Sequence, residues 1–121
     1  MATRSEQLEE RLIDFGASVC LVIRRLPKDL PGIHVSKQLV RCSTSPAANY
    51  AEARGSESRR DFAHKLHICL KELRETSVWL RFICRIQPEQ ALAAELRECD
   101  ELISIFVKSL RTTKASFDRP G

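Results

Sequence analysis

The sequence contains 121 residues, of which 43% are hydrophobic and 30% charged, proportions that suit one globular domain. Its formal net charge of +4 permits contact with nucleic acid but does not require it. No apolar run approaches the roughly 18 residues of a transmembrane helix, and the polar first residues are not typical of a signal peptide. The five cysteines have no zinc-ribbon spacing. In a chain whose first residues do not resemble a leader, we expect these thiols to be reduced and the protein to be cytoplasmic.

The first predicted helix covers residues 3–26. Thr3 and Glu6 have the spacing of a capping box, and Pro27 ends the helix. Apolar residues recur at alternating steps of four and three, which is the seam of a helix in a bundle. They are Leu8, Leu12, Phe15, Val19, Val22 and Leu26.

The second predicted helix covers residues 33–53 and has an unusual seam. Asn49 falls on this seam, where an unpaired amide would cost roughly 1–3 kcal/mol. We therefore expect a buried polar network of Asn49 with Glu72 or Glu75, which Arg41 could join. Paired carboxylates could also act as acid and base, but no nucleophile or oxyanion donor accompanies them. The expected inward positions are Val35, Leu39, Cys42, Pro46, Asn49 and Ala53.

The third predicted helix covers residues 58–87 and has the longest regular pattern in the chain. Ser58 and Asp61 form its expected N-terminal cap. Its seam consists of Phe62, Leu66, Cys69, Leu73, Thr76, Leu80 and Ile83.

The fourth predicted helix covers residues 88–110 and begins at Pro88, a residue suited to the first helical position. Residues 111–121 have no periodicity and are expected to form a flexible tail. Short links between long helices place neighbours antiparallel. The sequence thus predicts an all-α fold in which residues 1–110 form an up-down-up-down four-helix bundle. The fourth seam is Leu92, Leu96, Cys99, Ile103, Phe106 and Leu110.

Two blocks in the middle of the chain carry a family resemblance. The first, residues 38–53, reads Gln-Leu-Val-Arg-Cys-Ser-Thr-Ser-Pro-Ala-Ala-Asn-Tyr-Ala-Glu-Ala, and the second, residues 58–80, contains Lys-Glu-x-x-Glu-Thr. They resemble the four-helix-bundle proteins encoded within intervening sequences of bacterial 23S ribosomal RNA genes. The outer helices match this family only in length and pattern. Pro46 replaces a more usual aliphatic residue and could kink the second helix.

The resemblance implies a four-helix bundle that assembles as a ring-like homopentamer and has no established enzymatic activity. A similar bundle is the accessory protein of diversity-generating retroelements, a basic nucleic-acid-binding partner of a reverse transcriptase. These properties are expectations for the present chain.

Basic residues gather around the link between the second and third predicted helices. Such a cluster could contact the phosphates of RNA or DNA, or it could be an ordinary solvated turn. Little aromatic interleaving is present, so base stacking is not supported. The candidates are Lys37, Arg41, Arg54, Arg59, Arg60 and Lys65.

Trp79, Phe82 and Ile86 form a second apolar stripe beside the seam of the third helix. They could widen the core, or they could form an interface between subunits, which the family resemblance favours.

Neither the histidines nor the cysteines make a specific site. His64 and His67 could share a metal, but a pair of surface histidines is the simpler interpretation. Cys42, Cys69 and Cys99 occupy seam positions and are expected to pack as small hydrophobic residues, rather than to form a disulfide or a catalytic thiol.

The resulting hypothesis is a non-enzymatic homo-oligomer that contacts nucleic acid, RNA more readily than DNA. The alternative is a protein–protein interaction scaffold without nucleic-acid binding, and an enzyme is the least favoured possibility. No catalytic residue, metal, cofactor, small-molecule substrate or membrane contact is predicted.

Overall fold

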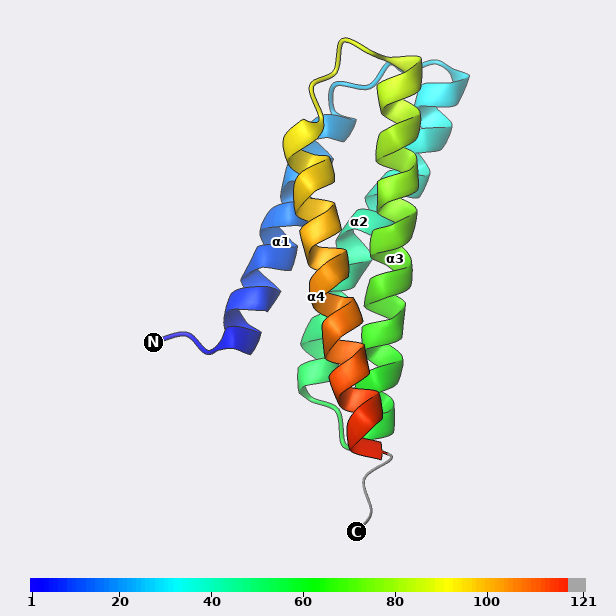
Figure 1. Cartoon of the computed structure of the whole chain (residues 1–121). Helices are drawn as coiled ribbons and strands as arrows, with labels where there is room; N and C mark the ends of the chain where they lie inside the picture. Colours follow the sequence, from blue (N-terminus) through cyan, green and yellow to red (C-terminus); the bar gives the residue numbers. More distant parts are fainter. Residues whose placement is uncertain (118–121) are drawn as a thin grey trace.

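The computed structural model describes residues 1–117 and consists of four α-helices, with no strand in this range. They are α1 (Arg4–Ile23), α2 (Leu30–Arg54), α3 (Arg59–Ile86) and α4 (Ala93–Phe117). The α1–α2 and α3–α4 connections lie at one end of the molecule and the α2–α3 connection at the other (Figure 1). Successive helices are therefore antiparallel, and the predicted all-α four-helix bundle is confirmed. No helix in this range has the length and hydrophobicity needed to cross a membrane.

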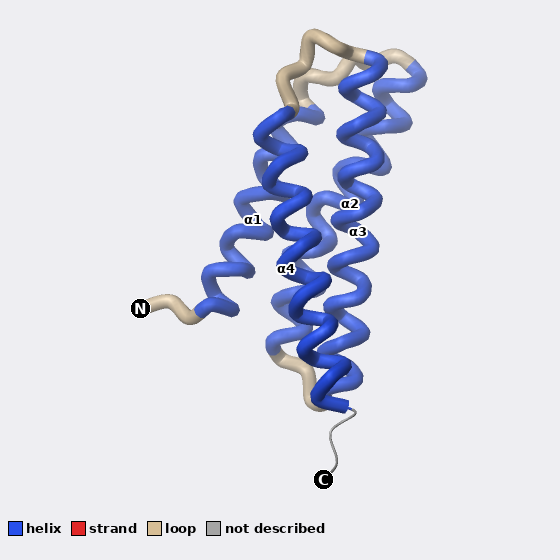
Figure 2. The backbone as a smooth tube through the Cα atoms, viewed as in Figure 1, coloured by secondary structure: helices blue, strands red, loops and turns tan. Residues whose placement is uncertain are grey.

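Each helix packs on the next, and α1 also touches α4, so that α1 and α3 lie on a diagonal of the bundle. Figure 2 shows that the N-terminal part of α1 leans away from the other helices, whereas α3 and α4 run side by side. The outer surfaces of α1 and α3 are therefore well separated.

Side-chain caps fix the beginnings of the first three helices. Thr3 Oγ1 accepts from the Glu6 amide at 3.1 Å, and Ser58 Oγ accepts from the Asp61 amide at 3.1 Å, as the sequence predicts. Helix α2 begins at Leu30, three residues before its predicted start. There Asp29 Oδ1 accepts from the Gly32 amide at 2.9 Å, and a proline fits the first turn. Gly32 thus belongs to the helix and not to the preceding link.

The boundaries of α4 differ from the prediction at both ends. Pro88 does not start the helix but lies in a turn in which the Gln90 amide donates to the Gln87 carbonyl at 3.0 Å. Proline suits the second position of such a turn as well as a helix start, because both need the same φ. At the other end α4 continues through residues 111–117 of the predicted tail. Residues 118–121 of that tail lie outside the described residues.

Side-chain hydrogen bonds accompany the extra turns of α4. The hydroxyls of Thr112 and Thr113 donate to carbonyls one turn earlier, at 3.1 and 2.8 Å. Arg59 Nη1 also donates to the Ser116 carbonyl at 3.3 Å and so ties the end of α4 to the start of α3. None of these hydrogen bonds involves an apolar side chain, so the apolar repeat does not predict the extra turns.

The seams predicted for α1 and α3 form much of the core, and two positions elsewhere are corrected. Tyr50 is buried in place of the predicted Asn49, and its ring meets that of Phe106 edge-on at 5.7 Å. Leu102 is fully buried, whereas Ile103 is only half-buried. In α2 the inward position moves one residue later, as expected when a straight helix of 3.6 residues per turn drifts from a strict 3.5-residue repeat. In α4 it moves one residue earlier, which this drift does not explain.

The second half of α2 carries small side chains and packs closely against its neighbours. A Cβ on Gly16 of α1 would lie 3.0 Å from the Ser43 carbonyl oxygen. Helix α2 runs through Pro46 as one element, so the helix is not interrupted there. The Pro46 carbonyl accepts from Cys69 Sγ of α3 at 3.5 Å.

Candidate nucleic-acid interface

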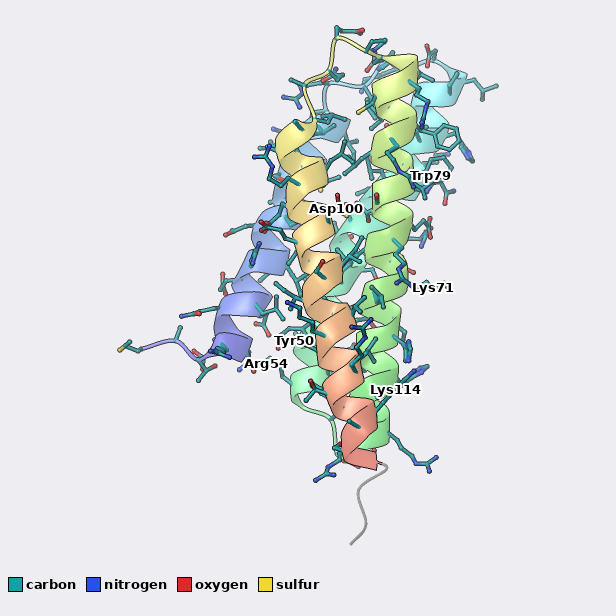
Figure 3. The ribbon with its side chains drawn as sticks, in the orientation of Figure 1. Tyr50, Arg54, Lys71, Trp79, Asp100 and Lys114 are labelled. Carbon is teal, nitrogen blue, oxygen red and sulfur yellow. The ribbon has the colours of Figure 1, made fainter. Side chains whose placement is uncertain are left out.

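One arginine at the α2–α3 link, Arg54, meets carboxylates of α1. Arg54 Nη1 lies 3.0 Å from Glu9 Oε1, and Arg54 Nη2 lies 4.0 Å from Glu6 Oε1. Figure 3 shows Arg54 near the N-terminal end of α1. Arg54 and Arg59 line an open surface depression of about 610 Å³ that also contains the carboxylates of Glu6 and Glu57. Nearby negative charge makes this depression a poor site for phosphate.

Lys65, a second member of the predicted cluster, is also paired. Its Nζ lies 2.7 Å from Glu52 Oε2, and this hydrogen bond raises the pKa of the Lys65 ammonium. Lys37 and Arg60 are exposed and have no ion pair with any described residue. The structure therefore divides the six predicted residues into paired and unpaired members, and does not join them in one uniformly basic surface.

Arg41, another predicted candidate, is the centre of a polar network. Its Nη1 donates to Glu72 Oε2 at 2.9 Å, and its Nη2 donates to Glu75. Glu75 also accepts from Trp79 Nε1 at 3.1 Å, and Glu72 is buried. The network fixes α2 against α3, which is a structural role.

Asn49 is not a member of this network, contrary to the prediction. The Asn49 Nδ2 group donates to the carbonyl and hydroxyl oxygens of Ser45, at 3.0 and 2.9 Å. These bonds stay within α2, because the half-buried Asn49 lies beside the inward position that Tyr50 occupies.

A second ion-pair cluster joins α1 to α4 and was not predicted. Arg11 donates to both oxygens of Glu98 at 2.7 Å, and it also pairs with Glu101. The hydrogen bond with Glu98 raises the pKa of the Arg11 guanidinium. Two-point contacts of this kind give the least-packed pair of helices a defined geometry.

The predicted interface residues lie on an apolar patch shared by α2 and α3. Trp79 packs against Phe82 with ring centroids 5.2 Å apart, and its ring meets that of His34 edge-on at 5.6 Å. The antiparallel register that these contacts set brings the first turns of α2 to the level of the last turns of α3. We define the apolar patch as Leu30, Ile33, Trp79, Phe82 and Ile86, of which all but the half-buried Trp79 are exposed.

An apolar hollow of about 270 Å³ lies between α1 and α2. The hollow exists because most of the side chains around it are small, and the exposed Ile13 forms part of its lining. We define the apolar hollow by its lining residues, which are Leu12, Ile13, Gly16, Ala17, Cys20, Thr44 and Ala47.

Three of the five thiols are buried, as the seam pattern predicts. Burial raises the pKa of the Cys69 and Cys99 thiols to about 12, and it raises the pKa of Cys42 as well. His64 and His67 are exposed on α3. Within residues 1–117, no three His, Cys, Asp or Glu side chains are grouped to hold a metal ion.

The outer surface of α3 carries a row of mainly basic side chains, of which only Arg60 was among the predicted nucleic-acid candidates. Seven of its eight residues precede a position of the predicted α3 repeat, from Phe62 to Ile83, by two places, which is about 200° of helical rotation, and Arg85 continues the same spacing. Figure 3 shows one of them, Lys71, on the side of α3 away from the other helices. We call this set the basic stripe, and it consists of the exposed residues Arg60, His64, His67, Lys71, Arg74, Val78, Arg81 and Arg85.

The stripe could have been found by continuing the same heptad count on the opposite face of the helix. The search for clustered charge in the sequence instead favoured the link, because Arg54, Arg59 and Arg60 lie close together along the chain.

The family model described as 23S rRNA-intervening sequence protein matches residues 7–111. A solved structure from Bacteroides thetaiotaomicron, of a protein of unknown function from the S23 ribosomal protein family, superposes with a TM-score of 0.80 at 25% sequence identity. The match covers 90% of this chain and 99% of the other. Comparison with curated proteins found no match. The family match covers most of the sequence and agrees with the resemblance seen in its two central helices, so the chain belongs to the 23S rRNA-intervening sequence protein family.

Proposed function

We propose that this protein is a non-enzymatic, cytoplasmic homo-oligomer that contacts nucleic acid. The observation that carries the nucleic-acid part is an imbalance in the ion pairs. The intramolecular pairs engage seven carboxylates but only four cations, Arg11, Arg41, Arg54 and Lys65. A chain whose formal charge is +4 therefore keeps a larger positive excess on its remaining surface. Such a surface attracts phosphate backbones at low salt.

RNA is the preferred ligand in this proposal because the family takes its name from an insertion in a ribosomal RNA gene. The test is a retardation assay with a structured RNA and a DNA of the same sequence, at low and at high salt. Binding that weakens steeply with salt is expected. No retardation of either ligand at low salt would leave the protein-interaction scaffold as the function.

The assembly part of the proposal rests on two apolar surfaces on different faces. The apolar patch lies on α2 and α3, and the apolar hollow lies between α1 and α2. A contact between two different surfaces of identical chains is head-to-tail, and it closes into a ring when the rotation permits. This agrees with the homopentamer that the family resemblance implies.

Light scattering of the purified protein tests the assembly. We expect a multiple of the single-chain mass, and Phe82→Ser with Ile86→Ser is expected to lower it, because both side chains are exposed members of the apolar patch. Ser104→Asp on the exposed side of α4 is the matched control and should leave the mass unchanged. A wild-type monomer at micromolar concentration would contradict the proposal.

A structural role, in preference to catalysis, is supported by how the reactive groups are used. The carboxylates of Glu72 and Glu75 are engaged with Arg41, and the thiols of Cys69 and Cys99 are buried with raised pKa values. Groups in these states serve packing and helix registration better than proton transfer or nucleophilic attack.

A further inference from the structure

We propose that the basic stripe of α3 is a docking face for the phosphate backbone of double-stranded nucleic acid. This inference rests on the proposed nucleic-acid contact and moves it from the α2–α3 link to the outer surface of α3. It follows from the composition of the stripe, from the absence of ion pairs along it and from its shape.

The stripe contains no acidic residue. Its members are five Arg or Lys, two His and one Val, along eight successive positions of one helical face. Outward faces of soluble helices usually mix the two signs of charge, because pairs at i, i+4 stabilise the helix. The outer side of α4 follows that usual pattern, with Arg97 near Asp100 and Glu101. A face without acidic residues therefore distinguishes the outer side of α3 from that of α4.

The cations of the stripe have no carboxylate partner among residues 1–117. No salt bridge of the described chain involves Lys71, Arg74 or Arg85, and Arg81 donates only to the Ser77 carbonyl of its own helix. The nearby carboxylates of Glu72 and Glu75 belong to Arg41. Like charges at i, i+3 or i, i+4, such as Lys71 with Arg74 and Arg81 with Arg85, destabilise a helix by roughly 0.2–0.5 kcal/mol per pair. A polyanion along the stripe would remove this repulsion.

The shape of the stripe fits a double helix better than a single strand. From Arg60 to Arg85 it extends roughly 38 Å at 1.5 Å per residue. This length is comparable with one turn of a duplex, about 34–36 Å. None of its members is Phe, Tyr or Trp. Single-strand binding uses a groove with aromatic side chains on which bases stack, whereas a duplex offers its phosphates on the outside without unstacking.

The test compares two triple variants that lose the same charge. The stripe variant is Lys71→Gln, Arg74→Gln, Arg81→Gln. The control variant is Arg24→Gln, Arg25→Gln, Lys28→Gln, whose exposed residues lie in the link that follows α1, the helix diagonal to α3. Circular dichroism melts establish that both variants fold. Fluorescence anisotropy then measures the Kd for a 20-base-pair RNA duplex, a DNA duplex and a single strand of equal length, from 50 to 200 mM salt.

With five cations on phosphates, the wild-type protein should bind duplex with a slope of log K against log salt of about −4.5. The stripe variant should lose about 2.7 of that slope, and its Kd at 100 mM salt should rise at least about tenfold, whereas the control changes little. The duplex that binds with the lower Kd, RNA or DNA, is the preferred ligand of the stripe.

Two results would overturn the inference while leaving the proposed function intact. The first is an equal loss of affinity in both triple variants, and the second is tighter binding of the single strand than of either duplex. Wild-type protein that binds none of the three ligands at 50 mM salt would instead reject the proposed function itself. Anionic phosphatidylserine vesicles that bind more tightly than duplex would overturn the assignment to nucleic acid.

Discussion

Arg41 Nη1 lies 2.9 Å from Glu72 Oε2, and this contact joins the middle of α2 to the middle of α3. The two ends of the pair are in different surroundings, because the Arg41 side chain is 50% exposed and the Glu72 side chain only 10%. The half-exposed guanidinium of Arg41 thus neutralises the negative charge of a carboxylate that is buried in the bundle. This explains why a cation in the predicted nucleic-acid cluster is occupied within the protein.

Replacement of Arg41 by Met should destabilise the fold, because Glu72 would stay buried without its partner. The loss for a fully buried pair is about 3–5 kcal/mol, and the exposure of Arg41 reduces our expectation to about 1–2 kcal/mol. Urea denaturation measures the free energy of unfolding. Lys37→Met is the control, since Lys37 is exposed on the same helix and has no salt bridge with the described residues. Equal stability of the two variants would show that the pair contributes nothing.

The sequence predicted the fold well because the apolar repeat is a one-dimensional signal. Leu12, Leu66 and Leu73 are buried where the repeat places them. It failed at Tyr50, one residue after the predicted position, because heptad counting cannot follow the drift of a straight helix. It also failed at Leu102, one residue before the predicted position, and this drift does not explain that difference.

The candidate site was harder to predict because ion pairing is a three-dimensional property. Arg54 and Lys65 belong to a basic segment of the sequence, yet their partners are Glu9 and Glu52 on other helices. Only the packed bundle shows which cations are left over. The exposed side of α3, whose cations make few ion pairs, was therefore not recognised as a candidate site from the sequence.

Gly32→Ala should destabilise the start of α2. A Cβ at this position would lie 1.9 Å from the Pro27 carbonyl oxygen and 2.9 Å from Asp29 Oδ1, so the link or the cap must move. We expect a loss of about 1–3 kcal/mol, measured by thermal or urea denaturation. Gly55→Ala is the matched control, because the nearest atom to its Cβ would be the Glu52 carbonyl oxygen at 3.7 Å. A Gly32→Ala variant as stable as the control would mean that the close approach is absent in solution.

Alkylation should distinguish the cysteines by burial. Cys20 and Cys84 are half-buried, whereas Cys42, Cys69 and Cys99 are buried. With iodoacetamide at pH 8 we expect Cys20 and Cys84 to react first, and the other three to react only after urea unfolds the chain. Peptide mass spectrometry over time gives each rate. Rapid modification of Cys69 in the folded protein would contradict the packing of α2 against α3.

The same buried thiols should make stability fall at high pH. The folded-state pKa values of Cys69 and Cys99 are raised from an ordinary value of 9.0 to about 12. Above pH 9 the unfolded chain releases these protons while the folded chain keeps them, so the free energy of the unfolded state falls relative to that of the folded state. The stability contributed by the two protonated thiols is fully present below pH 9 and is lost as the pH rises toward 12. Urea denaturation between pH 8 and 11 should show this decline, and Cys69→Ala with Cys99→Ala should make it shallower. An unchanged slope in that double variant would place the pH dependence on other groups.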